Sequence, residues 1–432
     1  MVRPQPQQIV VIGAGAAGLM AARELARAGR MVTILEARDR CGGRIHSLRA
    51  AEFGYPAEGG AEFVHGEAPV TRGLLREAGV CLLPIQGTRW TVENGTLSRD
   101  EPTVPYLGRL HKVLAELQSD MTVADFLQQH FPGPEYGQLR RSVVRMVEGY
   151  DAADPALASI LAVRDEWMGR GTGPQTRIVG GYGALVDFLA AECRRLGIVI
   201  HLNAAVRAVD ASRGRALVHC ANGDRHEGDA AILTVPLPLL HEIALPPAVG
   251  EKAAIAAAIG FGNVVKILLR FKTRWWVDAK GTDLSDLLFL VSDASIPVWW
   301  TQHPSEHPVM TGWVAGPRTE AVAHLDEHDL IETGLTSLAG IFGVSPEQLT
   351  QELVAAQAIN WEKDPFARGA YSYATPGTRA AQAVMADAAG GVILFSGEAL
   401  YRGPDMGTVE AALASGLETA RTILTKASTA TT

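Results

Sequence analysis

The chain has 432 residues, of which 47% are hydrophobic and 20% carry a formal charge, and its formal net charge is −8. This composition is typical of an ordered globular protein with room for two domains or one large two-lobed unit. The acidic balance and the lack of a basic cluster able to neutralise several phosphates argue against nucleic acid as a partner.

The first predicted elements are a strand, a tight turn and a helix. Four apolar residues, 9–12, lead into a Gly-x-Gly-x-x-Gly turn, and small and apolar residues then continue at helical spacing to Gly29. Gly13 permits the sharp turn, Gly15 lets a pyrophosphate approach the backbone, and Gly18 lets the helix pack closely on its strand. The amides and positive dipole of the helix start favour phosphate. The segment therefore predicts a dinucleotide site.

A second strand is predicted over residues 31–35, and it ends at Glu36. This carboxylate lies about 20 residues after the glycine turn, where it can accept hydrogen bonds from both ribose hydroxyls. Residues 38–44, Arg-Asp-Arg-Cys-Gly-Gly-Arg, add two glycines and a guanidinium that can fork onto phosphate. The first glycines leave NAD and FAD open, so this second segment has to decide between them.

The order of these motifs resembles the flavin-dependent amine oxidases, the family of monoamine oxidases, polyamine oxidases and lysine-specific histone demethylases. In that family a Gly-Gly-Arg follows the ribose glutamate, as Gly42, Gly43 and Arg44 follow Glu36 here, and FAD is the cofactor. The resemblance runs nearly end to end and is weakest between about residues 85 and 170. In its motifs it is closest to the polyamine oxidases.

The next block, residues 59–66, places three glycines around an apolar strand, which suggests backbone passing close to a flat ligand. In the family this block lies along the flavin, and its His-Gly ending at His65 is similar to the polyamine oxidases. The alternative for His65 is an ordinary polar group at a strand end. Phe63 stands where the amino-acid oxidases carry a carboxylate-binding arginine, which disfavours an amino-acid substrate.

The following segments are expected to alternate between two parts of the molecule. The pattern from Pro69 to about Arg170 predicts an inserted helical lobe. Its expected helices cover residues 71–78, 106–118, 123–129 and 136–148. A helix over 184–196, a strand over 198–202, and strands over 206–209, 216–220 and 230–236 that alternate as one half-buried sheet then return the chain to the cofactor domain. By resemblance, Val206 pairs its backbone with the adenine and Thr234 begins the turn leading out.

A second excursion is predicted to cover the flavin. It contains strands near residues 264–271, 286–291 and 309–314 and a helix near 330–342. A strand over 391–395 and a helix over 408–425 close the chain. The expected fold class is α/β, a Rossmann-like FAD-binding domain with a discontinuous α+β substrate domain. The first domain would comprise residues 1–68, 175–248 and 386–432, and the second residues 69–174 and 249–385 with the helical insertion.

Lys266 lies inside an apolar strand, where a charge must be paired or must face a wet cavity. Taken alone, it could be an edge-strand lysine that points to solvent. The spacing of Gly262, Lys266 and Phe271 resembles the strand whose lysine holds a water against flavin N5. That resemblance implies that Lys266 organises the water and stabilises charge during reoxidation by oxygen.

Trp361 and Tyr371 are the second marker, although composition alone allows packing aromatics and a turn. The resemblance places Trp361 near the isoalloxazine and makes Tyr371 one wall of the substrate cage. Monoamine oxidases have a flavin-bonding cysteine just before that tyrosine. This chain has Ala370 there, so FAD is expected to be bound non-covalently.

Glu398 and Thr408 are the third marker. Glu398 is an ordinary strand-end acid by its pattern, whereas the resemblance gives it a hydrogen bond to the ribityl chain. The helix beginning near Thr408 would aim its free amides at flavin N1 and O2, where reduction places negative charge. Thr408 also falls where monoamine oxidases have a second cage tyrosine, which implies a roomier pocket.

The candidate residues fall into three groups. The catalytic candidates are Lys266, Tyr371 and Trp361, and the substrate candidates are His65, Tyr371 and Thr408. The cofactor-binding candidates are Gly13, Gly15, Ala16, Gly18, Glu36, Ala37, Arg38, Gly42, Gly43, Arg44, Gly60, Ala61, Glu62, Phe63, Val206, Thr234, Trp361, Gly397, Glu398, Gly407, Thr408 and Val409. No metal site is expected, because the histidine pairs lack a third ligand. The Trp299-Trp300 pair is interpreted as packing or surface, though it could line the entrance.

The resemblance implies FAD-dependent oxidation of an amine with O2. A hydride equivalent passes from the carbon beside nitrogen to flavin N5, the imine hydrolyses to an aldehyde, and oxygen becomes H2O2. Two alternatives remain open: a flavin desaturase or dehydrogenase acting on an apolar substrate with a non-oxygen acceptor, and a non-catalytic flavin-binding protein. The identity of the amine and the oligomeric state are left open.

A cytoplasmic protein without a membrane partner is expected. The first eight residues lack an apolar signal core, and the longest apolar stretch, 253–271, is interrupted by polar and charged residues. The tail helix that anchors monoamine oxidases in the membrane is not found. The four cysteines are widely spaced, which is typical of reduced thiols.

Overall fold

The computed structural model describes residues 7–93, 95–99, 104–168, 175–212, 214–386, 392–403 and 405–429. The expectation that the start of the chain lacks an apolar signal core rests largely on residues 1–6, and the expected last strand begins at Gly391. Residues 1–6 and Gly391 lie outside the described residues.

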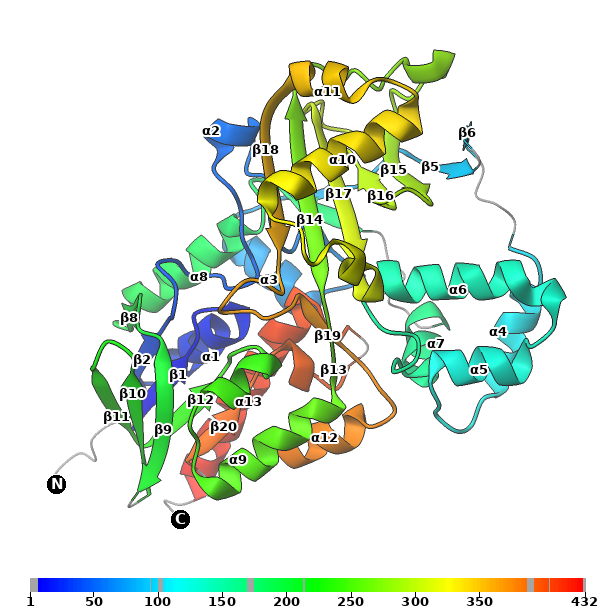
Figure 1. The fold of residues 1–432 in the computed structure, drawn as a ribbon. Helices are drawn as coiled ribbons and strands as arrows, with labels where there is room; N and C mark the ends of the chain where they lie inside the picture. Colours follow the sequence, from blue (N-terminus) through cyan, green and yellow to red (C-terminus); the bar gives the residue numbers. More distant parts are fainter. Residues whose placement is uncertain are drawn as a thin grey trace, which may run out of the picture.

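A five-stranded parallel sheet contains the predicted dinucleotide turn (Figure 1). Its order is β20 (Ile393–Phe395), β12 (Ala230–Leu233), β1 (Gln8–Ile12), β2 (Met31–Leu35) and β8 (Val199–His201). Every neighbouring pair is parallel. Both faces of this sheet are covered by other elements, so the apolar run of β1 is buried on both faces, with Ile9 and Val11 in one core and Val10 and Ile12 in the other.

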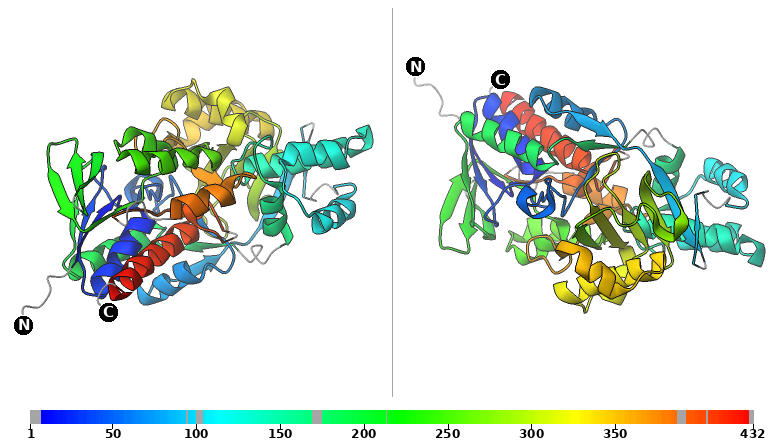
Figure 2. Two further views of the ribbon diagram at one scale, coloured as in Figure 1. Left: turned by 90° about the horizontal axis from the view of Figure 1, so that it is seen from below. Right: turned by 90° about the horizontal axis from the view of Figure 1, so that it is seen from above.

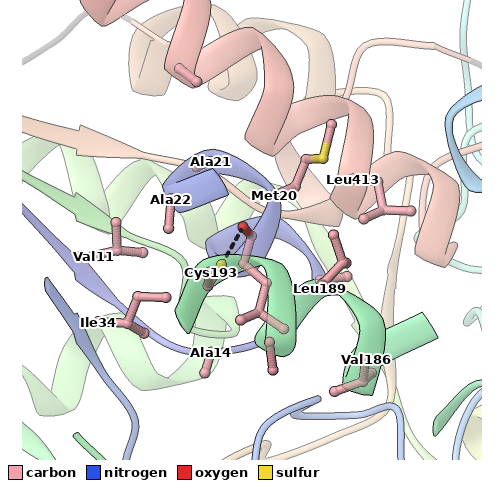
Figure 3. Close-up of a cluster of buried hydrophobic side chains, with 14 of the residues drawn as sticks. Val11, Ala14, Met20, Ala21, Ala22, Ile34, Val186, Leu189, Cys193 and Leu413 are labelled. Carbon is pink, nitrogen blue, oxygen red and sulfur yellow. Dashed lines mark hydrogen bonds between the residues drawn. The ribbon is translucent and has the colours of Figure 1, made fainter. Parts of the chain in front are cut away.

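Three helices cover one face of this sheet: α1 (Ala16–Arg27), α8 (Gly183–Arg195) and α13 (Val409–Thr429). Figure 3 shows Val11 and Ile34 of the sheet facing side chains of these helices, among them Met20, Leu189 and Leu413. The first and last segments of the chain therefore pack together, and α1 and α13 run side by side in both views of Figure 2.

The opposite face is covered by a three-stranded antiparallel sheet and two helices. These elements are β9 (Val206–Ser212), β10 (Arg215–Cys220), β11 (Arg225–Gly228), α9 (Pro247–Ala254) and α12 (Thr378–Ala386). The expectation of one half-buried sheet including residues 230–236 is wrong, because β12 pairs with β1 and β20 instead. The reason is burial: all four residues of β12 are buried, which suits an interior parallel strand.

The second large element is a seven-stranded mixed sheet (Figure 1). Its order is β18 (Leu353–Asn360), β14 (Val264–Phe271), β17 (Val309–Ala315), β16 (Val298–Trp300), β15 (Leu287–Ser292), β5 (Thr88–Glu93) and β6 (Thr96–Ser98). The helices α10 (Glu327–Phe342) and α11 (Pro346–Glu352) cover one face. Along β14, Val265, Ile267 and Leu269 pack into the core shared with α10, so the alternate residues point to the opposite face.

The helical lobe projects away from both sheets (Figures 1 and 2). It consists of α4 (Leu107–Glu116), α5 (Val123–His130), α6 (Gly137–Gly149) and α7 (Ile160–Met168), which enclose their own apolar core. The helices predicted over 71–78, 106–118, 123–129 and 136–148 are present as α3 (Pro69–Glu77), α4, α5 and α6, but α3 packs against α13 instead of joining this lobe. The expectation that residues 69–170 form one helical lobe is wrong for the strands within 82–98, because Trp90 and Val92 alternate into the core of the mixed sheet as part of β5.

Several short elements complete the architecture. They are α2 (Ala50–Phe53), α3 (Pro69–Glu77), β3 (Phe63–Val64), β4 (Leu82–Pro84), β7 (Thr176–Ile178), β13 (Gly260–Gly262), β19 (Tyr371–Tyr373), and 3-10 turns at Pro134–Tyr136, Leu237–Glu242, Ile255–Ala258, Ala279–Gly281, Gly316–Val322 and Glu398–Leu400. β3, β7 and β4 form a small antiparallel sheet, and β13 pairs with β19. Across the described residues, the helices lack the combined length and apolar character needed to cross a bilayer.

Candidate active site

A cavity of about 1050 Å³ runs from the glycine turn of the parallel sheet to the mixed sheet and the helical lobe. All of the predicted site residues line it except Gly18. Residues from nearly every part of the chain meet here, because β1, β14, β19 and α13 all end or pass at its wall.

The dinucleotide end is built by the first turn. Gly13 has a φ of +109°, which favours glycine, and a Cβ on Gly18 would lie 2.0 Å from the Gly13 carbonyl oxygen. Gly18 therefore has the packing position predicted for it. A Cβ on Gly15 would find its nearest neighbour, the Gly42 oxygen, only at 4.0 Å, so Gly15 is open to the cavity. The first turn of α1 carries no acidic side chain, and its positive end is left for an anion.

Glu36 joins this turn to the end of β2. Its Oε2 accepts a hydrogen bond from the Ala14 amide at 2.7 Å, and its Oε1 accepts one from the Arg38 amide at 2.9 Å. Burial raises the pKa of Glu36, and the two amides partly offset that effect. The carboxyl lines the cavity and keeps further acceptor capacity toward it.

The three arginines of residues 38–44 have different partners. Arg38 forks onto Asp364 with distances of 2.8 and 2.6 Å, so its guanidinium is already occupied by a carboxylate of the chain. Arg40 donates to backbone carbonyls of its own loop. Arg44 donates from Nη1 to Ala370 O and to Glu398 Oε1, each at 2.8 Å, and it lines the cavity.

Lys266 is buried at the far end of the cavity, with only 1% of the residue exposed. Its strand lies between β17 and β18, which excludes the alternative of an edge-strand lysine pointing to solvent. Nζ donates to Glu62 Oε2 at 2.9 Å and to Gly60 O at 3.1 Å, and it lies 5.2 Å from the centroid of the Trp300 ring.

Glu62 is the counter-ion of this lysine. It also accepts from Arg177 Nε at 3.0 Å, from Trp300 Nε1 at 3.0 Å and from Gln302 Nε2 at 3.1 Å. Burial by itself would raise the pKa of Glu62, but Lys266 and Arg177 outweigh burial and lower that pKa to about 2. The lysine is therefore held beside a fixed negative charge.

The aromatic candidates are held in place by backbone carbonyls. Trp361 Nε1 donates to Gly59 O at 3.2 Å, and the Tyr371 hydroxyl donates to Tyr150 O at 2.8 Å. Both side chains line the cavity. Each ring is thereby fixed in orientation at the cavity wall.

His65 and Thr408 also line the cavity. Gln175 Nε2 donates to His65 Nδ1 at 3.1 Å, and the Tyr150 hydroxyl lies 3.0 Å from the same atom. Burial lowers the pKa of His65 to about 4, so the ring is neutral at neutral pH. Thr408 Oγ1 donates to Asp405 O at 2.6 Å and accepts from the Ala411 amide at 3.1 Å, which caps the start of α13.

Several cavity residues were missed by sequence reasoning. Trp300 was interpreted as packing or surface, with the cavity entrance as an alternative; its indole N–H is bonded to Glu62, and the residue lines the cavity. Asp151, Glu166 and Asp405 line the side next to the helical lobe. No local signal distinguishes these acids from surface acids. Only the fold brings together the loop after α6, the helix α7 and the segment before α13.

The cysteines do not take part in the cavity. Cys41, Cys81, Cys193 and Cys220 are free thiols, and none of the four is among the residues that line it. Among the described residues, no group of three or more His, Cys, Asp or Glu side chains is arranged to hold a metal ion.

Curated proteins similar to this chain include human lysine-specific histone demethylase 2, which is 26% identical over 92% of this chain. Human peroxisomal N(1)-acetyl-spermine/spermidine oxidase is 27% identical over 98% of it. The chain spans about half of the first protein's length (51%) and 95% of the second. It spans 30% of Arabidopsis thaliana lysine-specific histone demethylase 1 homolog 3.

Solved structures similar to this one include a triple mutant of putrescine oxidase, with a TM-score of 0.79 and 22% identity over 98% of this chain and 99% of the other. Cyclohexylamine oxidase from Brevibacterium oxydans has a TM-score of 0.80 at 19% identity, over 98% of this chain and 100% of the other. These likenesses establish a shared fold. The family model described as flavin containing amine oxidoreductase matches residues 16–424. Because that match covers nearly the whole sequence, the chain belongs to the flavin-containing amine oxidoreductase family.

Proposed function

We propose that the protein is an FAD-dependent amine oxidase that oxidises the carbon beside an amine nitrogen and passes the electrons to O2. The products would be H2O2 and, after hydrolysis of the imine, an aldehyde. The observation that carries the proposal is one continuous cavity with a phosphate-binding turn at one end and, at the other, the buried Lys266 and Trp361 with the partly buried Tyr371.

The residues at the dinucleotide end of the cavity have the chemical groups needed to bind FAD. Gly15 and the amides of α1 would hold the pyrophosphate, Glu36 would accept the ribose hydroxyls, and Val206 lines the part assigned to the adenine. FAD supplies the hydride acceptor when it is bound. A non-covalent cofactor is favoured because Ala370 precedes Tyr371 and no cysteine lines the cavity.

The end of the cavity that contains Lys266, Trp361 and Tyr371, here called the reacting end, can serve the reaction in three ways. Tyr371 and Trp361 form apolar walls that would orient an amine and exclude water. The Lys266 ammonium is fixed by Glu62 and can orient a water and stabilise negative charge as oxygen is reduced. Neutral His65 can accept or donate a hydrogen bond without adding a charge that would repel an ammonium.

The same proposal divides the chain into the two domains that the sequence motifs suggest. Residues 1–68, 175–248 and 386–432 would form the FAD-binding domain, and residues 69–174 and 249–385 the substrate-binding domain. A cytoplasmic location and a small amine as partner belong to the proposal too.

Anaerobic mixing of the purified yellow holoprotein with a panel of amines tests this function. We expect at least one amine to bleach the absorption band of oxidised flavin, and air to restore it with release of H2O2. Bleaching only by apolar substrates, with no peroxide, would favour the flavin dehydrogenase alternative. Failure of every substrate would leave a non-catalytic flavoprotein.

Lys266→Met tests the oxygen step separately. We expect the variant to keep FAD and to be reduced by amine, but to be reoxidised by O2 about 100-fold more slowly, because a fixed charge that stabilises the reduced oxygen is lost. Stopped-flow reoxidation measures the rate. Lys272→Met, at an exposed position just after the same strand, should be reoxidised like the wild type. An unchanged rate in Lys266→Met would remove this lysine from the mechanism.

A further inference from the structure

His65 lies between two groups of residues at the reacting end of the cavity. Its ring packs edge-on against Tyr150, with centroids 5.6 Å apart, and the Tyr150 carbonyl oxygen accepts the hydrogen bond of the Tyr371 hydroxyl at 2.8 Å. Its ring also lies 6.2 Å from that of Phe63, which lies 5.8 Å from the ring of Trp300 beside the buried ammonium. Because His65 lines the cavity as well, it is placed to contact a substrate there.

Two neighbouring side chains contact the same nitrogen of this ring, Nδ1. Gln175 Nε2 lies 3.1 Å from Nδ1, and the Tyr150 hydroxyl lies 3.0 Å from it. An amide nitrogen carries hydrogen atoms and cannot accept, so Gln175 can only donate to Nδ1. Nδ1 is therefore an acceptor, and in a neutral ring the hydrogen atom must then be on Nε2. Nε2–H is the group that remains for a ligand in the cavity.

The His65 ring and the Tyr150 phenol both stay uncharged at neutral pH. Burial lowers the pKa of His65 to about 4 and raises the pKa of Tyr150. A hydrogen bond from Gln175 acts to lower the Tyr150 pKa, as a donor to the phenol oxygen does. The phenol hydrogen can therefore point at Nδ1 of His65, so both neighbours favour the same tautomer.

The elements around His65 also carry charged side chains. They are Glu67 after β3, Arg72 on α3, Arg177 on β7, Lys266 on β14, and Asp151, Glu166 and Asp405 at the side of the helical lobe. The three acids at the lobe raise the pKa of Tyr150, whereas burial accounts for the lowered pKa of His65. The tautomer of His65 is therefore set by its two hydrogen bonds.

From this arrangement, and resting on the proposed amine oxidation, we infer that Gln175 is a positioning residue. Together with the Tyr150 hydroxyl it holds His65 as an Nε2–H donor, and this donor selects the neutral form of the reacting amino group. A neutral amine has a lone pair that can accept from Nε2–H, whereas a protonated primary amine has three donors and no acceptor. The neutral His65 ring does not repel an ammonium by charge, but it offers the ammonium no acceptor.

This selection admits the form of the amine that can react. Loss of a hydride from the neighbouring carbon needs the lone pair of the nitrogen, which an ammonium lacks. A bound ammonium would also leave the buried Nε2–H without an acceptor, and an unsatisfied buried donor is costly. A hydrogen bond between two neutral groups contributes little net free energy, so it can be released as the lone pair moves into the carbon–nitrogen bond.

Nitrogen-15 NMR of the holoprotein, labelled at histidine, tests the tautomer. At neutral pH we expect His65 Nδ1 to have the chemical shift of an unprotonated ring nitrogen and Nε2 that of a protonated one. His65→Asn removes the two signals and so assigns them among the 12 histidines. A hydrogen atom on Nδ1 would overturn the inference. This measurement uses no substrate, so it does not depend on amine oxidation.

His65→Gln and His65→Glu test the selection, because the two side chains have the same shape but only the amide can donate. Anaerobic stopped-flow reduction by one amine, from about pH 6 to about pH 10, gives a dissociation constant and a saturated rate. In the wild type and in His65→Gln we expect the dissociation constant for total amine to fall about tenfold per pH unit below the pKa of the amine, at a nearly constant saturated rate. In His65→Glu the ammonium should bind, so the pH dependence should move to the saturated rate. The same behaviour in both variants would overturn the selection.

Gln175→Glu tests the positioning step. A carboxylate can only accept, so it should draw the hydrogen atom to Nδ1 of His65 and raise the pKa of that ring. NMR should show the changed tautomer, and the dissociation constant should fall by less than about threefold per pH unit. Gln118→Glu makes the same substitution at an exposed position of the helical lobe and should behave like the wild type in both measurements.

The outcomes separate this inference from the proposed function. If no amine reduces the flavin, amine oxidation fails, and the selection of a neutral amine fails with it. If amines reduce the flavin but the tautomer of His65 is the same in Gln175→Glu as in the wild type, Gln175 is not a positioning residue while amine oxidation stands. A change in Gln118→Glu as large as that in Gln175→Glu leads to the same conclusion.

Discussion

At the scale of single residues, the ion pair of Lys266 and Glu62 determines what the reacting end can do. A lysine inside a strand is stable only because a carboxylate with a pKa of about 2 lies 2.9 Å away. The same carboxylate holds Arg177 and the Trp300 indole. This one carboxylate therefore fixes the side chains of Lys266 and Arg177 and the indole ring of Trp300.

Glu62→Gln should therefore destabilise the protein by about 3–5 kcal/mol, because it leaves two buried cations without a counter-ion. Urea denaturation of the variant gives the change in the free energy of unfolding. Glu306→Gln removes an exposed carboxylate that pairs with the half-buried Arg274, and it should change that free energy by less than about 1 kcal/mol. Equal effects of the two substitutions would contradict the assigned role.

Glu58 is a second buried acid, and it lies outside the cavity. It accepts hydrogen bonds from the Ser47 hydroxyl and the Tyr182 amide. Burial outweighs these bonds and raises the pKa of Glu58 from 4.5 to about 7. The folded protein therefore binds this proton more tightly than the unfolded chain does.

Because the folded pKa is the higher one, the stability linked to Glu58 is complete below pH 4.5 and is lost as the pH rises through about 7. Glu58→Gln keeps acceptor and donor atoms but cannot ionise. The variant should match the wild type near pH 4.5 and exceed it by up to about 3 kcal/mol above pH 7. Unfolding free energies measured across this range check the sign, and a constant difference would refute it.

At the scale of elements, the contact between α1 and α13 joins the two ends of the chain behind the cofactor end of the cavity (Figure 2). Gly416 makes the close approach possible, since a Cβ at this position would lie 2.3 Å from the Ala17 carbonyl oxygen. Both helices also line the cavity through their first residues. The distance between α1 and α13 therefore fixes where the first residues of both helices lie at the cavity wall.

Gly416→Ala should destabilise the protein by about 1–3 kcal/mol, because the helices would have to move apart. Gly340→Ala is the matched control, as Gly340 is exposed on α10 and a Cβ there meets nothing within 4 Å. Its higher helix propensity should make the control neutral or more stable by up to about 1 kcal/mol. Thermal unfolding of both variants distinguishes them, and two equal shifts would argue against the close contact.

At the scale of the whole molecule, the cavity is the space between the parallel sheet, the mixed sheet and the helical lobe. A ligand that filled its length would touch all three parts. Such a ligand adds its binding free energy to the stability of the folded state.

We expect added FAD to stabilise the apoprotein against thermal unfolding, by about 2.7 kcal/mol when its concentration is 100 times its dissociation constant. Riboflavin is the control. It lacks the adenine and both phosphates, so it cannot reach the glycine turn and should stabilise less at the same concentration. Equal stabilisation by the two compounds would contradict the assignment of the turn to the pyrophosphate.

The features that depend on local pattern can be predicted from the amino-acid sequence without knowledge of the fold. The strand, glycine turn and helix of residues 8–27, the acid at Glu36 and the strand of Lys266 all lie where they were predicted. Each rests on periodicity or on a conformational need within about twenty residues.

Which distant residues meet follows from the folding of the whole chain. The pairing of Glu62 with Lys266, the place of β12 in the parallel sheet and the nearness of Asp151 to Glu166 have no local signal. The physical reason is that charge pairing and strand pairing act through space. The residue that neutralises a buried charge is chosen by the fold, however far away it lies in the sequence.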